Sequence, residues 1–170
     1  MKLIKTISDK DFFPNNETVP IENTTISRTA VRTILFNKNN EIALVGETYI
    51  VLPGGGMEKD ESYEETIKRE VKEEIGYEID IIGEIGKIIE YRNKAGVIQE
   101  SYCLISRVKN TEPINMTQIN GLENKIIWFN IDKAIEILDK EYSEIDKDDY
   151  HSYFNIEANR IFLLEAKKSI

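Results

Sequence analysis

The stretch LPGGGMEKDESYEETIKREVKEEIGY, residues 52–77, decides the fold of this chain of 170 residues. Three consecutive glycines lie near its start, and a short acidic segment ends at a further glycine. Ser62 and Glu65 form a capping box, in which the two side chains satisfy backbone N–H groups left unpaired at a helix start. Gly76 is typical of the left-handed residue that follows a helix. The stretch therefore predicts a helix that begins directly after Ser62 and stops just before Gly76.

The expected helix has one apolar face and one acidic patch. Its apolar residues recur every four positions, as on a buried helix face; they are Tyr63, Ile67, Val71 and Ile75. Glu70, Glu73 and Glu74 lie at positions i, i+3 and i+4, so their carboxylates crowd together beside this face. Two interpretations are open. The patch is either a hydrated surface, where repulsion costs roughly 0.2–0.5 kcal/mol per pair, or a set of carboxylates that share a cation.

The glycines follow a segment whose composition is typical of a strand. β-Branched and aromatic residues at positions 49–52 predict a strand that ends at Pro53 and turns into the helix. Glycine loses more backbone freedom on folding than any other residue. Gly54, Gly55 and Gly56 therefore indicate either the close approach of a ligand or another backbone, or an ordinary flexible turn.

The combined pattern resembles the signature box of the Nudix hydrolases. Its charged and glycine positions all recur here at the expected spacing: Gly55, Glu61, Arg69, Glu70, Glu73, Glu74 and Gly76. At roughly 0.07 per fixed residue, seven chance identities have a probability on the order of 10⁻⁸ per start position. Tyr77 departs from the aliphatic residue that the family prefers, at a position expected to pack rather than to react.

The resemblance implies a role for each of these positions. Glu70, Glu73 and Glu74 match the carboxylates that bind divalent metal in the family. Arg69 with Glu61 matches its structural ion pair, and Gly55 matches its turn glycine. Clustered carboxylate oxygens also suit Mg²⁺ on chemical grounds, or Mn²⁺, shared with the phosphates of a substrate.

The charge of the chain restricts its partners. A net charge of −9 argues against general nucleic-acid binding, which normally requires a basic surface. A phosphate substrate then needs bound metal and local cations to reverse the field at the site. The candidate cations are Arg28, Arg32, Arg92 and Lys94. We expect substrate contacts from Gly54, Gly55 and Arg32.

The remaining segments predict a single α/β domain over residues 1–170. Strands are expected at 2–7, 26–36, 41–46, 78–91, 97–108 and 125–130, loops at 8–25 and 110–124, and helices at 131–138 and 147–168. The resemblance implies a Nudix-like α/β/α sandwich with a mixed β-sheet. The apolar stripe of the last helix could support a homodimer or cover the protein's own sheet.

The composition indicates a soluble protein. Hydrophobic residues make up 41% of the chain, and no apolar run reaches the roughly 18 residues of a membrane span. The N-terminus lacks the apolar core of a secretory signal. Because Cys103 is the only cysteine, no internal disulfide can form, and we expect a cytoplasmic protein in which Cys103 is buried.

The resemblance implies hydrolysis of a phosphoanhydride in a nucleoside diphosphate linked to another group, with a nucleoside triphosphate as the leading substrate. One carboxylate, in the box or in a later loop, would accept the proton of the attacking water. Glu123 resembles a downstream glutamate that some members use as an extra ligand or base; Glu112 and Glu100 are weaker candidates, and all three could be hydrated surface groups. Trp128 is expected in the core and His151 on a helix surface.

Two other classes of function remain open at this point. A nucleotide-sensing module could keep the fold without turnover, although such a module would usually have lost metal carboxylates or gained a DNA-binding domain. A purely structural protein would need neither the glycines nor the three carboxylates, and Glu70→Gln would then change stability alone.

Overall fold

The structure is a computed structural model, and it describes residues 1–15, 26–46, 48–109, 126–146 and 148–169. The described strands form one seven-stranded mixed sheet in the order β1-β5-β6-β2-β3-β7, with β4 paired to β2. Their bounds are β1 Leu3–Ser8, β2 Arg28–Phe36, β3 Ile42–Val45, β4 Gly54–Gly56, β5 Ile79–Arg92, β6 Val97–Val108 and β7 Ile126–Phe129. The α-helices are α1 Asp9–Phe12, α2 Tyr63–Ile75, α3 Ile131–Glu144 and α4 Tyr150–Lys167.

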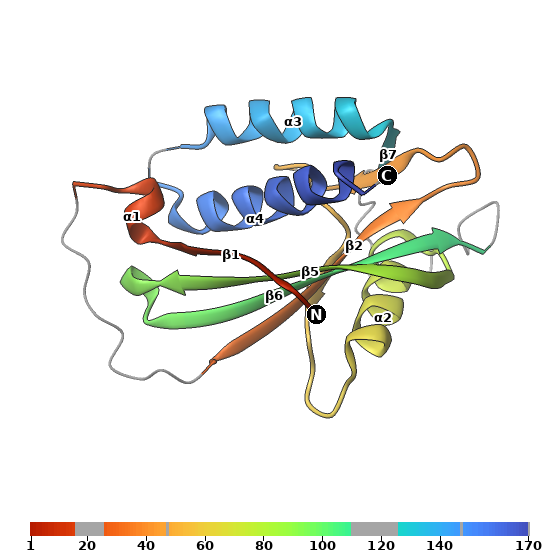
Figure 1. The fold of residues 1–170 in the computed structure, drawn as a ribbon, viewed down its shortest axis with the longest axis horizontal. Coiled ribbons are helices and arrows are strands. Elements are labelled where there is room, and N and C mark those ends of the chain that lie inside the picture. The colour runs from red at the N-terminus through yellow and green to blue at the C-terminus, as the bar shows by residue number, and fades with distance from the viewer. Residues whose placement is uncertain (16–25, 47, 110–125, 147, 170) are drawn as a thin grey trace.

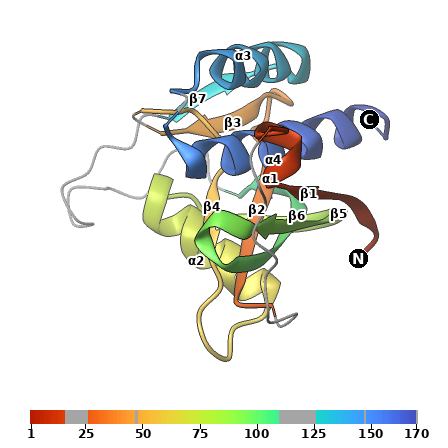
Figure 2. The same ribbon diagram turned by 90° about the vertical axis from the view of Figure 1, so that its left-hand side faces the viewer.

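Helices cover both faces of the sheet (Figure 1 and Figure 2). On one face α2 packs through Ile67, Val71 and Ile75, all of which are buried, as the four-residue period predicts. The opposite face is covered by α1, α3 and α4, and its core includes Phe154 and Phe162 of α4. The expected α/β/α sandwich with a mixed sheet is confirmed.

The described part of α4 turns its apolar residues toward the protein's own sheet. Phe154, Phe162 and Leu163 are fully buried, and Tyr150 and Ala158 nearly so, in the core that α4 shares with α3 and the sheet. The sequence left open whether this apolar stripe supports a homodimer or covers the protein's own sheet, and the structure shows that it covers the sheet. None of the helices in the described ranges is long and apolar enough to cross a membrane.

β2 is the strand that organises the region of the box. It runs parallel to β6 along its full length, from Arg28 opposite Gln99 to Phe36 opposite Arg107. Its other edge is divided, because residues 30–32 pair with β4 and Phe36 pairs with β3. The long pairing with β6 holds β2 in place, and β4 is thereby fixed beside the first half of β2.

The prediction of a strand at 49–52 followed by a glycine turn is wrong. Within 49–52, Val51 makes an isolated bridge to Val45, and the glycines themselves are the strand, β4, antiparallel to β2. Local propensity favours the β-branched residues, but register against β2 places the glycines in the ladder. The pairing answers one question left open, since the backbone that comes close to the glycines is that of β2.

Other boundaries differ by smaller amounts. The expected loop at 8–25 contains α1, a short helix that Ser8 and Asp11 close with a capping box. α3 extends to Glu144 rather than 138. The box helix has the predicted bounds: Ser62 accepts from the backbone N–H of Glu65, and Gly76 has φ of 71°. The predicted loop at 110–124 lies almost wholly outside the described residues.

Candidate active site

The glycines of β4 are required by what surrounds them. A Cβ on Gly54, whose φ is +133°, would lie 2.1 Å from the carbonyl oxygen of Val31. A Cβ on Gly55 would lie 2.4 Å from the carboxyl carbon of Glu70. Real Cβ atoms do not approach other atoms this closely, so a side chain at either position must displace its neighbour. Gly54 thus permits the pairing with β2, and Gly55 leaves the space that the Glu70 carboxylate fills.

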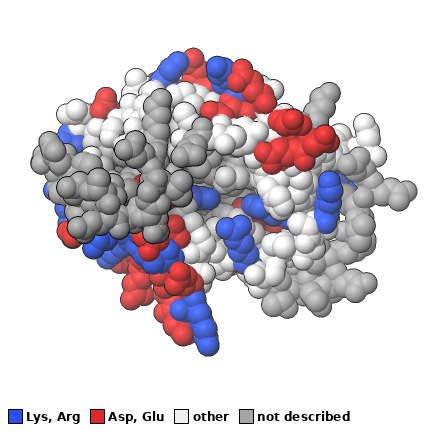
Figure 3. All heavy atoms as spheres, turned by 180° about the vertical axis from the view of Figure 1, so that it is seen from behind, with Lys and Arg blue, Asp and Glu red and all other residues white. Residues whose placement is uncertain are grey.

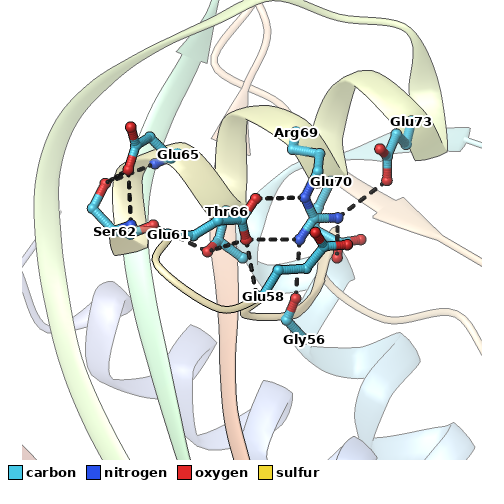
Figure 4. Close-up of polar contacts among 9 residues, drawn as sticks. All are labelled: Gly56, Glu58, Glu61, Ser62, Glu65, Thr66, Arg69, Glu70 and Glu73. Carbon is cyan, nitrogen blue, oxygen red and sulfur yellow. Dashed lines mark hydrogen bonds and ion pairs between the residues drawn. The ribbon is translucent and has the colours of Figure 1, made fainter.

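Arg69 organises the acidic face of α2 (Figure 4). Its Nε and Nη2 donate to the two carboxylate oxygens of Glu61 at 2.7 and 3.0 Å, which is the bidentate geometry of a strong ion pair. Its Nη1 donates to Glu70 at 2.8 Å and to Glu73 at 3.1 Å, and Nη2 also donates to the carbonyl of Gly56 at 3.0 Å. The predicted Glu61–Arg69 pair is formed, and it ties the loop before α2 to the end of β4.

The Glu61 carboxylate accepts two further hydrogen bonds. The backbone N–H of Glu58 donates to it at 2.9 Å and the Thr66 hydroxyl at 3.0 Å. Hydrogen bonding to Arg69 first, and then to Glu58, lowers the pKa of Glu61 to about 2. This carboxylate is therefore ionised at neutral pH and acts as a fixed anchor for Arg69.

Glu74 lies on the other side of the acidic patch and has a different environment. The backbone N–H of Gly54 donates to its Oε2 at 2.9 Å, which joins the last turn of α2 to the glycine strand. Burial raises the pKa of Glu74 to about 7, with repulsion from Glu70 and Glu73 acting in the same direction, while Gly54 and Arg32 oppose it. Glu74 can therefore exchange a proton near neutral pH.

Arg32 reaches the same strand from β2. Its Nη1 donates to the carbonyl oxygen of Gly54, and its Nη2 donates to Oδ1 of Asn155 on α4 at 3.3 Å. Burial lowers the pKa of Arg32, opposed by the charge of Glu74. Arg32 thus lies beside β4, and part of its hydrogen bonding holds the glycine backbone; its contact with substrate stays a prediction.

The three box carboxylates have the chemistry of a divalent-metal site. Carboxylate oxygens are the ligands that Mg²⁺ and Mn²⁺ prefer, and mutual repulsion within the patch is a charge excess that a cation relieves. In the described ranges, no three His, Cys, Asp or Glu side chains are already arranged around a common point for a metal ion. Figure 4 shows Arg69 between Glu70 and Glu73, where its Nη1 donates to one oxygen of each carboxylate. The residues fit a metal, and the second oxygen of each of these two carboxylates accepts no hydrogen bond from Arg69.

The downstream candidates have separate outcomes. Glu123 and Glu112 lie outside the described residues. Glu100 on β6 accepts from Lys87 and from the Tyr102 hydroxyl, each at 2.6 Å, so both of its oxygens are occupied.

The expectations for four other side chains can be compared with the structure. Cys103 and Tyr77 are buried, as expected. Trp128 is half-buried and packs edge-on against Tyr77. His151 is exposed on α4.

Sequence reasoning missed the contribution of α4 to this region. Asn159 is almost fully buried, and its Oδ1 accepts from the backbone N–H of Leu52 at 3.1 Å, two residues before the glycine segment. Its Nδ2 donates to the backbone carbonyl and to Oδ1 of Asn155, and the same Oδ1 accepts from Arg32. Two asparagines four positions apart within an apolar helix were the available signal, since such residues are seldom buried without a partner.

Basic side chains gather locally despite the net charge of −9. Figure 3 shows the molecule from behind, with Lys and Arg side chains in the middle of this face and acidic groups toward the lower left and upper right. Arg28, Arg32 and Arg92 line one pocket, together with residues of β6 and α4. Lys94, the fourth candidate cation, instead lies over the ring of Tyr150 at 5.5 Å.

Comparison with known proteins agrees with this geometry. A family model described as "NUDIX domain" matches residues 26–151, which is more than half of the chain. A crystal structure of UDP-X diphosphatase matches with a TM-score of 0.55 at 16% identity, covering 89% of this chain and 68% of that one. A NUDIX hydrolase from Nitrosomonas europaea matches with a TM-score of 0.54 at 18% identity, covering 78% and 90%.

An ADP-ribose pyrophosphatase from Streptococcus suis is also similar, with a TM-score of 0.50 at 17% identity, covering 82% of this chain and 92% of that one. Such low identities show a shared fold. No curated protein matches the chain by sequence. The family model, together with the box helix set against the glycine strand, shows that the chain belongs to the Nudix hydrolase family.

Proposed function

We propose that this protein is a metal-dependent hydrolase that cleaves a phosphoanhydride bond in a nucleoside diphosphate linked to another group, with nucleoside triphosphates as the leading substrates. One observation carries the proposal: α2 places two carboxylates against β4, where Glu74 accepts from Gly54 and Glu70 fills the space above Gly55, and Arg69 joins Glu73 to Glu70. We further propose a single cytoplasmic domain that acts on small molecules and does not bind nucleic acid in general.

Glu70, Glu73 and Glu74 would hold the metal, which we take to be Mg²⁺, with Mn²⁺ as the alternative. Bound there, the ion would polarise the phosphoryl oxygens and lower the pKa of a water molecule. Arg69 keeps Glu70 and Glu73 in place through its pair with Glu61. Arg32 adds positive charge beside the glycine strand, where the phosphates would lie.

Proton transfer requires a carboxylate whose pKa lies near the working pH. Among the described residues of the box, burial raises the pKa of Glu74 to about 7 in the metal-free protein, so Glu74 is a candidate base if Glu70 and Glu73 alone hold the metal. Glu123 stays a candidate for the same role. The roles of base and of metal ligand can be distinguished by substitution. Loss of the base lowers kcat, whereas loss of a metal ligand also weakens metal binding.

The test is Mg²⁺-dependent hydrolysis of a panel of dNTPs, 8-oxo-dGTP, ADP-ribose, NADH and diadenosine polyphosphates. We expect turnover of one class, and a loss of about 10²–10⁴-fold in kcat for Glu74→Gln. Glu64→Gln is the matched control, because Glu64 is an exposed glutamate of the same helix that pairs with Lys68. Metal-dependent binding without turnover of any panel member would replace this proposal with a nucleotide-sensing module.

A further inference from the structure

A cavity of about 230 Å³ lies between β2, the β5–β6 hairpin and the N-terminal end of α4. Three strands and one helix therefore contribute to its wall. Its lining residues are all polar or charged: Arg28, Arg32, Arg92, Gln99, His151, Ser152 and Asn155. We call it the arginine pocket.

The arginine pocket adjoins the candidate active site. Arg32 lines it and donates to the carbonyl of Gly54, whose N–H donates to Glu74. At the other end of β4, Nη2 of Arg28 is the nearest atom to a Cβ placed on Gly56, at 3.9 Å. The glycine strand β4 therefore contacts both the box carboxylates and two of the arginines that line the pocket.

Two of the three arginines are already held by the protein. Arg32 is engaged by Gly54 and Asn155. Arg92 donates through Nε and Nη2 to the buried carboxylate of Glu90, at 2.9 and 2.5 Å. The charge of Arg92 is thus paired, and the charge of Arg32 is fixed at the inner wall.

Two lining groups keep unused hydrogen-bonding capacity. Within the described ranges, the guanidinium of Arg28 is exposed and takes part in no hydrogen bond or ion pair. Gln99 is 4% exposed, and its Nε2 donates to Glu90 and Ser101, at 3.1 and 2.8 Å. Its Oε1 is buried and has no hydrogen-bond partner in the part of the chain that the structure describes. A buried amide oxygen without a donor is rare in folded proteins and indicates that a donor arrives from elsewhere.

The lining does not suit a nucleobase. Among the described residues around the pocket, the only ring is the exposed imidazole of His151. Bases are usually held by stacking on aromatic faces together with apolar contact. A free guanidinium beside an unpaired amide oxygen instead fits a group with a negative charge and an O–H donor.

We propose that the arginine pocket selects substrates in which the group linked to the diphosphate is itself anionic and carries an O–H donor. Arg28 binds the anionic oxygens, and Oε1 of Gln99 accepts the hydrogen bond. Two sources have this chemistry, a terminal phosphate near its second pKa and an acidic sugar. The inference rests on the proposed hydrolysis and names the part of the substrate that is recognised.

Matched substrate pairs test the proposal. dATP with dADP, and UDP-glucuronate with UDP-glucose, differ by one anionic group each. We expect the charged member of at least one pair to have the higher kcat/KM. Arg28→Gln should reduce the ratio of kcat/KM between the charged and the uncharged member about tenfold, because one charge-assisted hydrogen bond is lost. Arg28→Lys retains the charge and should restore part of the ratio. The pair that responds identifies the source of the anion.

Lys38→Gln is the matched control for charge. Lys38 is exposed and follows the far end of β2, whose eight residue steps from Arg28 to Phe36 span about 27 Å. The variant makes the same change in net charge and should leave the ratio unchanged. Equal kcat/KM within both pairs, or a ratio indifferent to Arg28→Gln, would overturn the proposal. The proposal would also be overturned if the wild type discriminated among the four bases and Arg28→Gln did not.

A binding experiment tests this inference separately from the proposed hydrolysis. In EDTA, which removes the metal contribution, glucuronic acid 1-phosphate should bind more tightly than glucose 1-phosphate. Binding should shift the NMR signals of the Gln99 side-chain amide. If no panel substrate is hydrolysed and this binding is seen, the hydrolysis proposal fails and the pocket stands. If hydrolysis occurs and the amide signals do not move with either sugar phosphate, the pocket proposal fails alone.

Discussion

Single residues decide the geometry of the carboxylate patch, and Gly55 shows this most directly. Gly55→Ala would bring a methyl group to 2.4 Å from the Glu70 carboxyl carbon, so Glu70 must leave its position beside Arg69. We expect metal affinity to fall about 10–100-fold, the usual effect of disturbing a group that orients a ligand. Isothermal titration with Mn²⁺ measures it.

Gly56→Ala is the control for that variant. It lies next in the same strand, and a Cβ there would meet only Nη2 of Arg28, at 3.9 Å. Its metal affinity should stay within about twofold of the wild type, because an ordinary van der Waals contact leaves the ligands in place. Equal losses in both variants would show that β4 itself, and not the space above Gly55, controls the carboxylates.

The proton on Glu74 should compete with metal. Burial raises the pKa of Glu74 to about 7, so below this pH the carboxyl is protonated and a metal must displace the proton. We expect Mn²⁺ affinity to fall about tenfold per pH unit as the pH decreases from 7 toward 5, followed by EPR. In Glu74→Gln the affinity should be weaker, and its slope over this range should be shallower. A wild-type affinity that stays constant between pH 5 and 7 would contradict the assignment.

At the scale of elements, the Glu61–Arg69 pair attaches the loop before α2 to the helix and to β4. The pKa of Glu61 is lowered from 4.5 to about 2, so the pair stabilises the fold fully above pH 4.5 and loses its contribution as the pH falls toward 2. Glu61→Gln should therefore unfold more easily in urea at neutral pH. Its urea midpoint should also fall less steeply than that of the wild type between pH 4.5 and 2.

Glu165 provides a comparison on another element. Its pKa is also lowered to about 2, by Lys168 and Lys2, and it ties α4 to the N-terminus of the chain. In Glu165→Gln the urea midpoint should also fall less steeply than in the wild type between pH 4.5 and 2, and Mn²⁺ affinity should be unchanged. Glu61→Gln should weaken that affinity, because Arg69 then loses the anchor that positions it against Glu70 and Glu73. Equal metal affinity in both variants would assign the pair a role in stability alone.

At the scale of the whole molecule, the two helical layers are stabilised by separate cores on the two faces of one sheet. Phe162 of α4 is fully buried, and Phe162→Ala should lower the free energy of unfolding by about 3–5 kcal/mol. Ile82→Ala is the control, because Ile82 is 56% exposed and its loss should cost about 0.5 kcal/mol or less. Urea titration measures both.

The same variant tests what α4 covers. Since its apolar residues pack on the protein's own sheet, the melting temperature of Phe162→Ala should be lowered equally at all protein concentrations. A loss of stability that vanishes at high concentration would indicate that α4 also supports a homodimer.

The sequence by itself determined the box helix and its chemistry. Ser62, Glu65 and Gly76 act on backbone groups within one turn, and the spacing of Glu70, Glu73 and Glu74 depends only on the helical period. These features follow from neighbours a few positions away. The start of α2 near Tyr63 and its end at Ile75 were accordingly predicted from the sequence.

Only the tertiary structure decided what lies opposite that helix. β4 is a strand because β2 pairs with it, although propensity favours the residues before the glycines. The arginine pocket joins Arg28 of β2 to Gln99 of β6 and Asn155 of α4. No local pattern encodes such contacts, since parallel pairing and helix packing bring together residues that are far apart in the chain. The sequence therefore specified the carboxylates, and the fold determined which cations and which unpaired amide oxygen lie together in the pocket.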